Sequence, residues 1–393
     1  MPFEHTPQAP DEVLNLRAVI AAIAAISVVG IALGLGIPLL SIVMENRGYS
    51  ASLIGTNTAI AGLASLIAAP FATPIAARFG VVQTIFISIM VGAFSFIAFY
   101  FFESFLLWGV FRFILHFAMT LLFILSEFWI SISAPPSKRG LMLGIYATVL
   151  SLGFAVGPWL FSQVGSAGLT PFALGFGIII LALIPLVHAW KESPNIAGEK
   201  HSSFVPFLFA VPTATAAVLV FGAVETGGFS LLPVYGTRLG YSESDSAMLL
   251  TVIGLGNVLM QIPIGLLSDR VRDKRYLLLA LALFGLIGVM SMTLVAGNWR
   301  WLAIVLFLWG GAIAGLYTVG LAHLGSRLTG RDLASANAAF IFCYAIGMLL
   351  GPQLIGVGMD WVGPNGFSYA LALFFLFYIA LSLQRIIFVK RRG

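Results

Sequence analysis

Four ionisable residues interrupt long apolar stretches of this chain. Arg112, His116 and Glu127 lie in one stretch, and Glu225 lies in another. An ionisable side chain within a membrane costs a few kcal/mol at mid-span on insertion scales, so it usually faces protein or water. A carboxyl group in such a place can carry a proton, and an arginine can hold an anionic group. These residue types therefore predict chemistry of proton movement or ligand binding inside an apolar layer.

The first three of these residues fall on one side of a helix. Arg112 and His116 are four residues apart, and Glu127 follows Arg112 by fifteen, which at about 100° per residue lands within about 60° of the same face. Arg112 either couples protonation to conformation or holds an anionic group, or it is a structural arginine bonded to backbone carbonyls. Glu127 either lines a cavity or pairs with Lys138 or Arg139. For His116 we favour a neutral packing residue over a proton carrier.

Glu225 stands directly before Thr226-Gly227-Gly228. Gly228 corresponds to Gly36 at an offset of 192 residues, whereas Glu225 corresponds to Leu33. Corresponding glycine interruptions in two halves of a transporter point to its binding site. A charge present in one half only is not needed for shared packing, so we expect Glu225 to carry a proton. The alternatives are that it pairs with a cationic substrate or bonds to a neighbouring helix.

Amides and tyrosines at helical spacing give weaker candidates for the same cavity. In a helical bundle such side chains are as often interhelical hydrogen-bonding or packing groups as ligands. These candidates are Asn257, Gln261, Tyr317, Asn337 and Tyr344.

The elements that position these residues follow from composition and length. Of 393 residues, 60% are hydrophobic and 9% are charged, against about 45–50% and 25% in soluble domains. This excludes a soluble enzyme, a nucleic-acid binder and a disordered chain. Helix satisfies its own backbone in lipid, and the length allows twelve spans. We expect them at 17–43, 52–77, 81–101, 104–130, 139–163, 169–190, 204–236, 245–268, 275–296, 300–325, 332–356 and 365–389.

The chain also repeats itself. Gly48-Tyr49-Ser50 recurs as Gly240-Tyr241-Ser242, and Arg78 recurs as Arg270, both at an offset of 192. This pattern predicts two six-helix bundles, residues 1–190 and 204–393, joined by a cytoplasmic linker at 191–203. Most of the 20 Lys and Arg residues fall in the loops of one side, which places both termini in the cytoplasm.

The loop after the eighth span carries a recognisable motif. Gly265, Asp269, Arg270, Lys274 and Arg275 fit the pattern G-x-x-x-D-R-x-G-R-R/K, with Arg272 where the second Gly usually stands. Here the sequence resembles the major facilitator superfamily. The first-half copy is degraded, since it keeps Arg78 but has Ala77 in place of Asp. The resemblance implies an all-α integral membrane fold of twelve transmembrane helices in two pseudo-symmetric bundles. It also implies that these residues latch the bundles together in one conformation, unless the loop is only a solvated basic loop.

Two further stretches resemble motifs of that superfamily. Arg112 fits an intramembrane pattern R-x-x-x-G, with His116 at the Gly position. The fifth span resembles its antiporter motif but lacks the final Gly pair. The alternative is plain helix packing and bending, favoured by a copy in the eleventh span. The residues concerned are Gly144, Gly153, Gly157, Pro158, Gly347, Gly351 and Pro352.

These observations predict a secondary active transporter of a small molecule in a bacterial inner membrane. We expect alternating access, proton coupling and a slight preference for export by antiport. The alternatives are a symporter or uniporter importing a sugar, organic acid or nucleoside, and a non-transporting sensor or scaffold. We expect no enzyme activity, because no nucleophile or metal motif is present, and no cofactor. The expected partners are the substrate, protons and the lipid bilayer, with no nucleic acid, for a monomeric protein.

Overall fold

The computed structural model describes residues 15–135, 138–194, 205–328 and 330–390, and every regular element in these ranges is helical. The first half contains α1 (Leu16–Asn46), α2 (Ala51–Phe79), α3 (Val81–Phe101), α4 (Phe105–Ser133), α5 (Arg139–Val164), α6 (Thr170–Leu181), α7 (Leu183–His188) and a 3₁₀ turn at Trp190–Glu192. The second half contains α8 (Phe207–Ala210), α9 (Pro212–Arg238), α10 (Glu243–Arg270), α11 (Lys274–Val295), α12 (Trp299–Gly325), α13 (Gly330–Val362) and α14 (Gly366–Lys390).

Twelve helical segments in the described ranges are long and apolar enough to cross a membrane, which confirms the predicted fold class. α6 and α7 together form one of these spans, Thr170–His188. The seventh span begins at Pro212 and not at 204, because Pro212 lies in the first turn of α9, where a missing N–H costs least. The predicted linker at 191–203 lies mostly outside the described residues.

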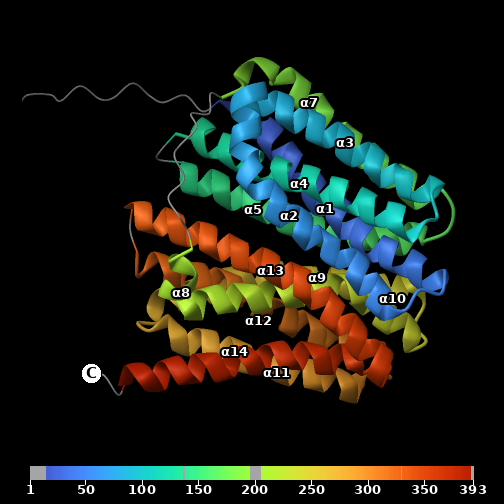
Figure 1. Cartoon of the computed structure of the whole chain (residues 1–393), viewed down its shortest axis with the longest axis vertical. Coiled ribbons are helices and arrows are strands. Elements are labelled where there is room, and N and C mark those ends of the chain that lie inside the picture. The colour runs from blue at the N-terminus through green and yellow to red at the C-terminus, as the bar shows by residue number, and fades with distance from the viewer. Residues whose placement is uncertain (1–14, 136–137, 195–204, 329, 391–393) are drawn as a thin grey trace, which may run out of the picture.

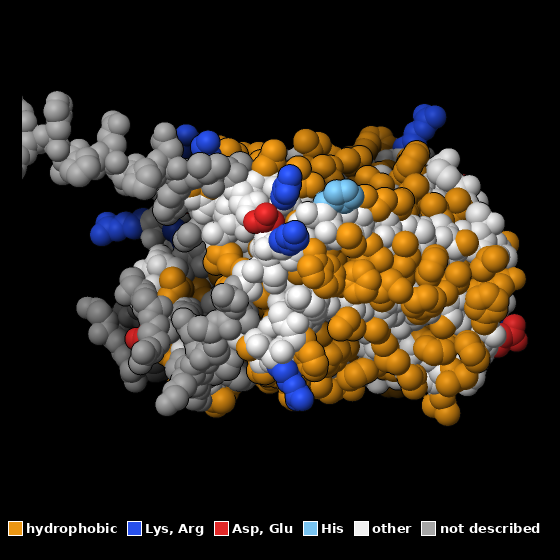
Figure 2. Space-filling view, turned by 90° about the horizontal axis from the view of Figure 1, so that it is seen from above, with side chains coloured by type: hydrophobic (Ala, Val, Ile, Leu, Met, Phe, Trp, Pro, Cys, Tyr) orange, Lys and Arg blue, Asp and Glu red, His pale blue; other side chains and the backbone are white. Residues whose placement is uncertain are grey.

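The two halves form two bundles, with α1 to α7 on one side of the molecule and α8 to α14 on the other (Figure 1). The bundles meet where α2 packs on α13, α5 on α10 and α1 on α9. Figure 2 shows a face covered mostly by hydrophobic side chains, with charged side chains gathered toward one end and at the opposite tip. Such a band is what a bilayer requires of a protein surface.

Glycines allow close packing within each bundle. A Cβ at Gly153 would lie 2.7 Å from the Cα of Gly30 on α1, and one at Gly157 would meet Gly34. In the second bundle Gly347 and Gly351 of α13 pack in the same way on the backbone of α9, at Leu219 and Ala223. Pro158 and Pro352 lie inside α5 and α13. Gly144 differs, since among the described residues no atom lies within 4 Å of a Cβ built there.

The two ends of the molecule differ in how the bundles are joined. We call the end formed by the loops 47–50, 165–169 and 239–242 the closed end. We call the other, where α2, α10 and α12 end at Phe79, Arg270 and Gly325, the open end. Hydrogen bonds between the bundles gather toward the closed end. They join Ser41 and Thr58 to Ser230, Asn46 and Ser166 to Glu243, Ala51 and Ser52 to Asp360, Thr251 to Ala155, and Arg238 to Glu45.

Candidate functional site

Glu225 lies within α9 and is half-buried. The Oη of Tyr344, on α13, donates a hydrogen bond to Glu225 Oε2 at 2.6 Å. In the part of the chain that the structure describes, no Lys, Arg or His forms an ion pair with this carboxylate. A carboxylate within a span and without a cation is costly, so this arrangement calls for another group to neutralise it.

Aromatic rings surround this pair. Phe221 on α9, Tyr317 on α12, and Phe340 and Tyr344 on α13 form what we call the aromatic cluster. The ring centroids of Phe221 and Tyr317 are 5.4 Å apart, those of Phe221 and Tyr344 are 5.9 Å apart, and those of Tyr317 and Phe340 are 5.4 Å apart. The cluster draws on three helices of one bundle, so it fixes the Tyr344 hydroxyl against Glu225. Tyr317 and Tyr344, both predicted as site residues, are therefore brought together with Glu225.

Glu127 lies on α4, in the other bundle, and its side chain is exposed. The alternative partner Lys138 is exposed and forms no ion pair with Glu127 among the described residues. The side chain of Arg139 lies outside the described part.

Arg112 is fully buried on α4, at 0% exposure. Its Nε donates to Asn57 Oδ1 on α2 at 2.7 Å, and its backbone oxygen lies 3.1 Å from His116 Nδ1. Both terminal guanidinium nitrogens, Asn57 Nδ2 and His116 Nε2 are buried without a hydrogen-bond partner in the described structure. Buried donors of this kind are normally satisfied, so the group can accept an anion, a carbonyl oxygen or water.

The weaker candidates are more scattered. Asn257 and Gln261 are half-buried on α10, and Asn337 is half-buried on α13. Among the described contacts, none of the three bonds to Glu225 or joins the aromatic cluster. We therefore place the core of the candidate site at Glu225, Tyr344 and Tyr317.

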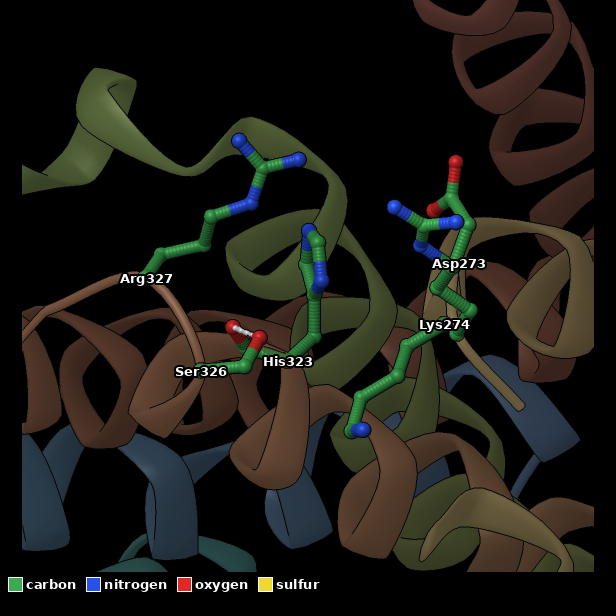
Figure 3. A pocket seen from close by; sticks show the side chains of 6 residues that line it. Asp273, Lys274, His323, Ser326 and Arg327 are labelled. Carbon is green, nitrogen blue, oxygen red and sulfur yellow. Dashed lines mark hydrogen bonds between the residues drawn. The ribbon is translucent and has the colours of Figure 1, made fainter. Parts of the chain in front are cut away.

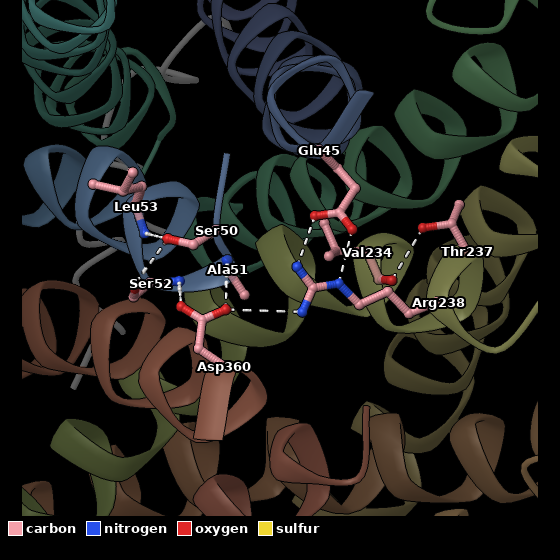
Figure 4. Close-up of polar contacts among 9 residues, drawn as sticks. All are labelled: Glu45, Ser50, Ala51, Ser52, Leu53, Val234, Thr237, Arg238 and Asp360. Atoms are coloured by element: carbon pink, nitrogen blue, oxygen red, sulfur yellow. Dashed lines mark hydrogen bonds and ion pairs between the residues drawn. The ribbon is translucent and has the colours of Figure 1, made fainter. Parts of the chain in front are cut away.

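The closed end holds a polar group that crosses between the bundles (Figure 4). Arg238 Nε and Nη2 bind Glu45 Oε1 and Oε2 at 2.7 and 3.0 Å, and Arg238 Nη1 lies 3.9 Å from Asp360 Oδ1. Asp360 in turn accepts from the backbone N–H groups of Ala51 and Ser52, each at 2.9 Å. Because these N–H groups open α2, Asp360 of one bundle caps a helix of the other. We call Glu45, Arg238 and Asp360 the closed-end lock.

The motif residues of the predicted latch lie apart from the opposite bundle. Asp269 and Arg270 end α10 with exposed side chains, and neither forms an ion pair within the described ranges. Lys274 Nζ donates to the Ser268 carbonyl at 3.2 Å. Arg275 binds Asp273 of its own loop. The remaining two residues of the predicted latch are Gly265 and Arg78. Among the described residues no atom lies within 4 Å of a Cβ built on Gly265, and Arg78 is exposed.

Comparison with known proteins decides the family. The family model of the Major Facilitator Superfamily matches residues 22–256 and 238–392. The chain belongs to the major facilitator superfamily. The uncharacterized MFS-type transporter YfkF of Bacillus subtilis is 26% identical over 358 residues, covering 88% of this chain and 90% of that protein. The uncharacterized MFS-type transporter YE1530 of Yersinia enterocolitica is 25% identical over 280 residues, covering 71% of this chain and 72% of the relative.

Solved structures share the fold. A mutant of the nucleoside transporter NupG matches with a TM-score of 0.78 at 12% identity, over 94% of this chain and 99% of that one. A bacterial homologue of the human lysosomal transporter Spinster, inward-facing and unoccupied, matches with a TM-score of 0.72 at 15% identity, over 95% and 96%. Family and fold thus assign the chain to membrane transport and not to catalysis.

The sequence alone did not predict several of the residues that form these contacts. Asn57, an uncharged amide in a span, gave no signal until Arg112 was seen to donate to it. Phe221 is one of 33 phenylalanines. The residues of the closed-end lock, Glu45, Arg238 and Asp360, lie near span ends, where charge is ordinary. No local pattern distinguishes a residue whose partner lies in the other bundle.

Proposed function

We propose that this protein is a proton-coupled secondary transporter that exports a small organic molecule in exchange for protons, with Glu225 as the coupling carboxylate. The observation that carries the proposal is the contact of Glu225 with Tyr344 at 2.6 Å without a cationic partner among the described residues. A carboxylate in a low-dielectric site with one hydrogen bond is stabilised by taking up either a proton or a positively charged ligand.

The aromatic cluster supports a cargo class. Rings beside a carboxylate suit an organic cation, since the ring faces attract positive charge and the carboxylate pairs with it. A proton and a cation then compete for Glu225. That competition gives exchange, because release of one accompanies uptake of the other.

Orientation supports the direction of access. The charge bias of the loops supports a cytoplasmic open end, and on that basis we propose that this conformation is inward-facing. We propose that the protein lies in a bacterial inner membrane with both termini cytoplasmic and works as a monomer of two bundles that rock about the site. The Arg112 group holds unsatisfied donors in the first bundle, and we propose that it couples that bundle to cargo or proton binding.

The test uses purified full-length protein in liposomes, with ethidium as the organic cation and an imposed pH gradient. We expect gradient-driven ethidium movement for the native protein and its loss for Glu225→Gln, which removes the charge and keeps the shape. Tyr344→Phe should weaken it. Glu103→Gln is the matched control, since the Glu103 side chain is 87% exposed at the closed end.

Three results would change the assignment. Equal movement by the native protein and Glu225→Gln would overturn the role of Glu225. Movement of ethidium together with protons would replace exchange by symport. No movement of any cation, with identical behaviour of both proteins across pH, would favour the sensor or scaffold.

A further inference from the structure

A pocket of about 300 Å³ lies at the open end of the second bundle, away from Glu225 and the aromatic cluster. The loop between α10 and α11 forms one wall, and the end of α12 with the residues after it forms the other (Figure 3). Its lining residues are Arg272, Asp273, Lys274, His323, Ser326 and Arg327.

The lining carries a net positive charge. Arg272, Lys274 and Arg327 supply three cations, and Asp273 is the acidic residue among the lining groups. The Asp273 carboxylate is already engaged, because Arg275 binds it through Nε at 3.0 Å and Nη2 at 2.7 Å. These hydrogen bonds from Arg275 hold the pKa of Asp273 below its usual range. Asp273 therefore stays ionised and paired with Arg275, which leaves the three cations uncompensated.

The donors of the pocket remain available to a ligand. Arg272 and Arg327 are exposed, and neither forms an ion pair in the described ranges. Lys274 donates one N–H to the Ser268 carbonyl, and its ammonium group has two further N–H donors. The imidazole of His323 is 4% exposed and stands between Arg327 and Asp273 (Figure 3). Several N–H donors with positive charge around one space match a tetrahedral oxyanion, for which arginine is especially suited.

The position of the pocket at the ends of the membrane spans points to a lipid as the source of that oxyanion. Three membrane spans end or begin beside it, at Arg270, Lys274 and Gly325, so it lies at the level of the lipid headgroups. Exposed apolar side chains follow within one helical turn, Tyr276 on α11 and Leu321 on α12, where acyl chains would lie. Basic pockets between membrane helices on the cytoplasmic side bind anionic headgroups.

We propose that this pocket binds the phosphate group of an anionic phospholipid from the leaflet at the open end. The bound phosphate bridges the loop after α10 to the end of α12 and relieves repulsion among Arg272, Lys274 and Arg327. The loop concerned is the one that follows Asp269, so the lipid holds the predicted latch in place relative to its own bundle. This inference is independent of the proposed cargo and coupling.

The test is thermal unfolding of the purified full-length protein in a neutral detergent. Short-chain phosphatidylglycerol is titrated, with phosphatidylcholine of the same chain length and inorganic phosphate in parallel arms. We expect phosphatidylglycerol alone to raise the melting temperature. The double variant Arg272→Gln, Arg327→Gln should weaken its apparent affinity about twenty-five-fold, because each basic residue near an anionic surface contributes about a factor of five.

Two variants control for charge and folding. Arg300→Gln removes an exposed arginine at the opposite end of α12 and should leave the lipid response unchanged. Arg327→Lys keeps the charge and should retain most of it. An unchanged response in the double variant, or an equal response to phosphatidylcholine, would overturn the proposal. A full response to inorganic phosphate with no greater effect of phosphatidylglycerol would overturn the lipid as the source.

Discussion

The two ends of the molecule use similar charged residues in opposite ways. At the closed end, Arg238 of one bundle binds Glu45 of the other, and Asp360 caps the first turn of α2 across the interface. At the open end, Asp273 and Arg275 pair within a single loop, and Asp269 is exposed. From this difference we infer that the end whose carboxylates reach across the bundle interface is the end that stays closed.

The two ends share an arrangement in which an aspartate lies near the end of a helix that packs on the other bundle. Asp360 lies near the end of α13 and caps α2, the helix on which α13 packs. Asp269 lies at the end of α10, which packs on α5. We therefore predict that Asp269 takes the place of Asp360 in the opposite conformation, with the start of α5 as its target. Among the described residues, only the Asp360 cap is formed.

The contacts of glycines also differ between the two ends, with contact across the bundle interface at the closed end. A Cβ at Gly55 would meet the Pro352 carbonyl, and one at Gly356 would meet the Ala51 carbonyl, both across the bundle interface. At Gly144 and Gly265, toward the open end, no atom lies within 4 Å of an added Cβ. Closure thus requires backbone contact at the closed end, and a side chain there should prevent it.

The largest expected effect is that of Gly55→Ala. The new methyl group would meet backbone and not a movable side chain, so relief requires the bundles to separate, at a cost of about 1–3 kcal/mol. We expect a shift of about ten-fold toward conformers that are open at this end. The measurement is the distance between spin labels on Glu103→Cys and Gly297→Cys, one on each bundle at the closed end, in a background with Cys343→Ala.

The matched control is Gly265→Ala, which adds the same methyl group at the open end of this conformer. It should not move the bundles apart at the closed end. A Gly55→Ala protein with the native distance distribution would contradict the requirement for backbone contact at the closed end.

The second effect concerns the closed-end lock. Arg238→Gln removes a two-pronged, partly buried ion pair with Glu45 and a charge close to Asp360. Pairs of this geometry contribute about 1–2 kcal/mol. This free energy corresponds to a five- to thirty-fold change in the ratio of open to closed conformers, which the labels should report as a shift toward opening. The charge exchange Arg238→Glu with Glu45→Arg should restore part of the native distribution.

Arg47→Gln gives the control at the same end. Arg47 lies 3.9 Å from Glu103 of its own bundle, so its loss should not move the bundles apart. Since Glu103 carries a label above, this control uses a label at the neighbouring exposed Phe102. If Arg47→Gln opened the closed end as far as Arg238→Gln, the effect would come from surface charge and not from the lock.

The fold could be predicted because the bilayer imposes it. The twelve helices and two bundles could be predicted from three features together. These are the length of each span, the fact that a chain that does not close into a barrel crosses lipid as helices, and the offset of the repeat. Glu225 could be singled out because a charge in an apolar run is rare. Its contact with Tyr344 could not, because the two residues lie 119 positions apart. The closed-end lock was missed for the same reason, since pairing between bundles depends on conformation as well as on fold.

The smallest expected effect separates the two ends most sharply. Among the described residues Asp269 forms no ion pair or hydrogen bond with the first bundle, so Asp269→Asn should not weaken this conformer. It should weaken the opposite one by only about 0.5 kcal/mol, because Asn can still cap a helix and only the negative charge near the helix N-terminus is lost. The labels at the closed end should therefore report slightly fewer open conformers than in the native protein. Combined with Arg238→Gln, it should reverse part of the opening. A wider closed end in Asp269→Asn would show that the two carboxylates are not counterparts.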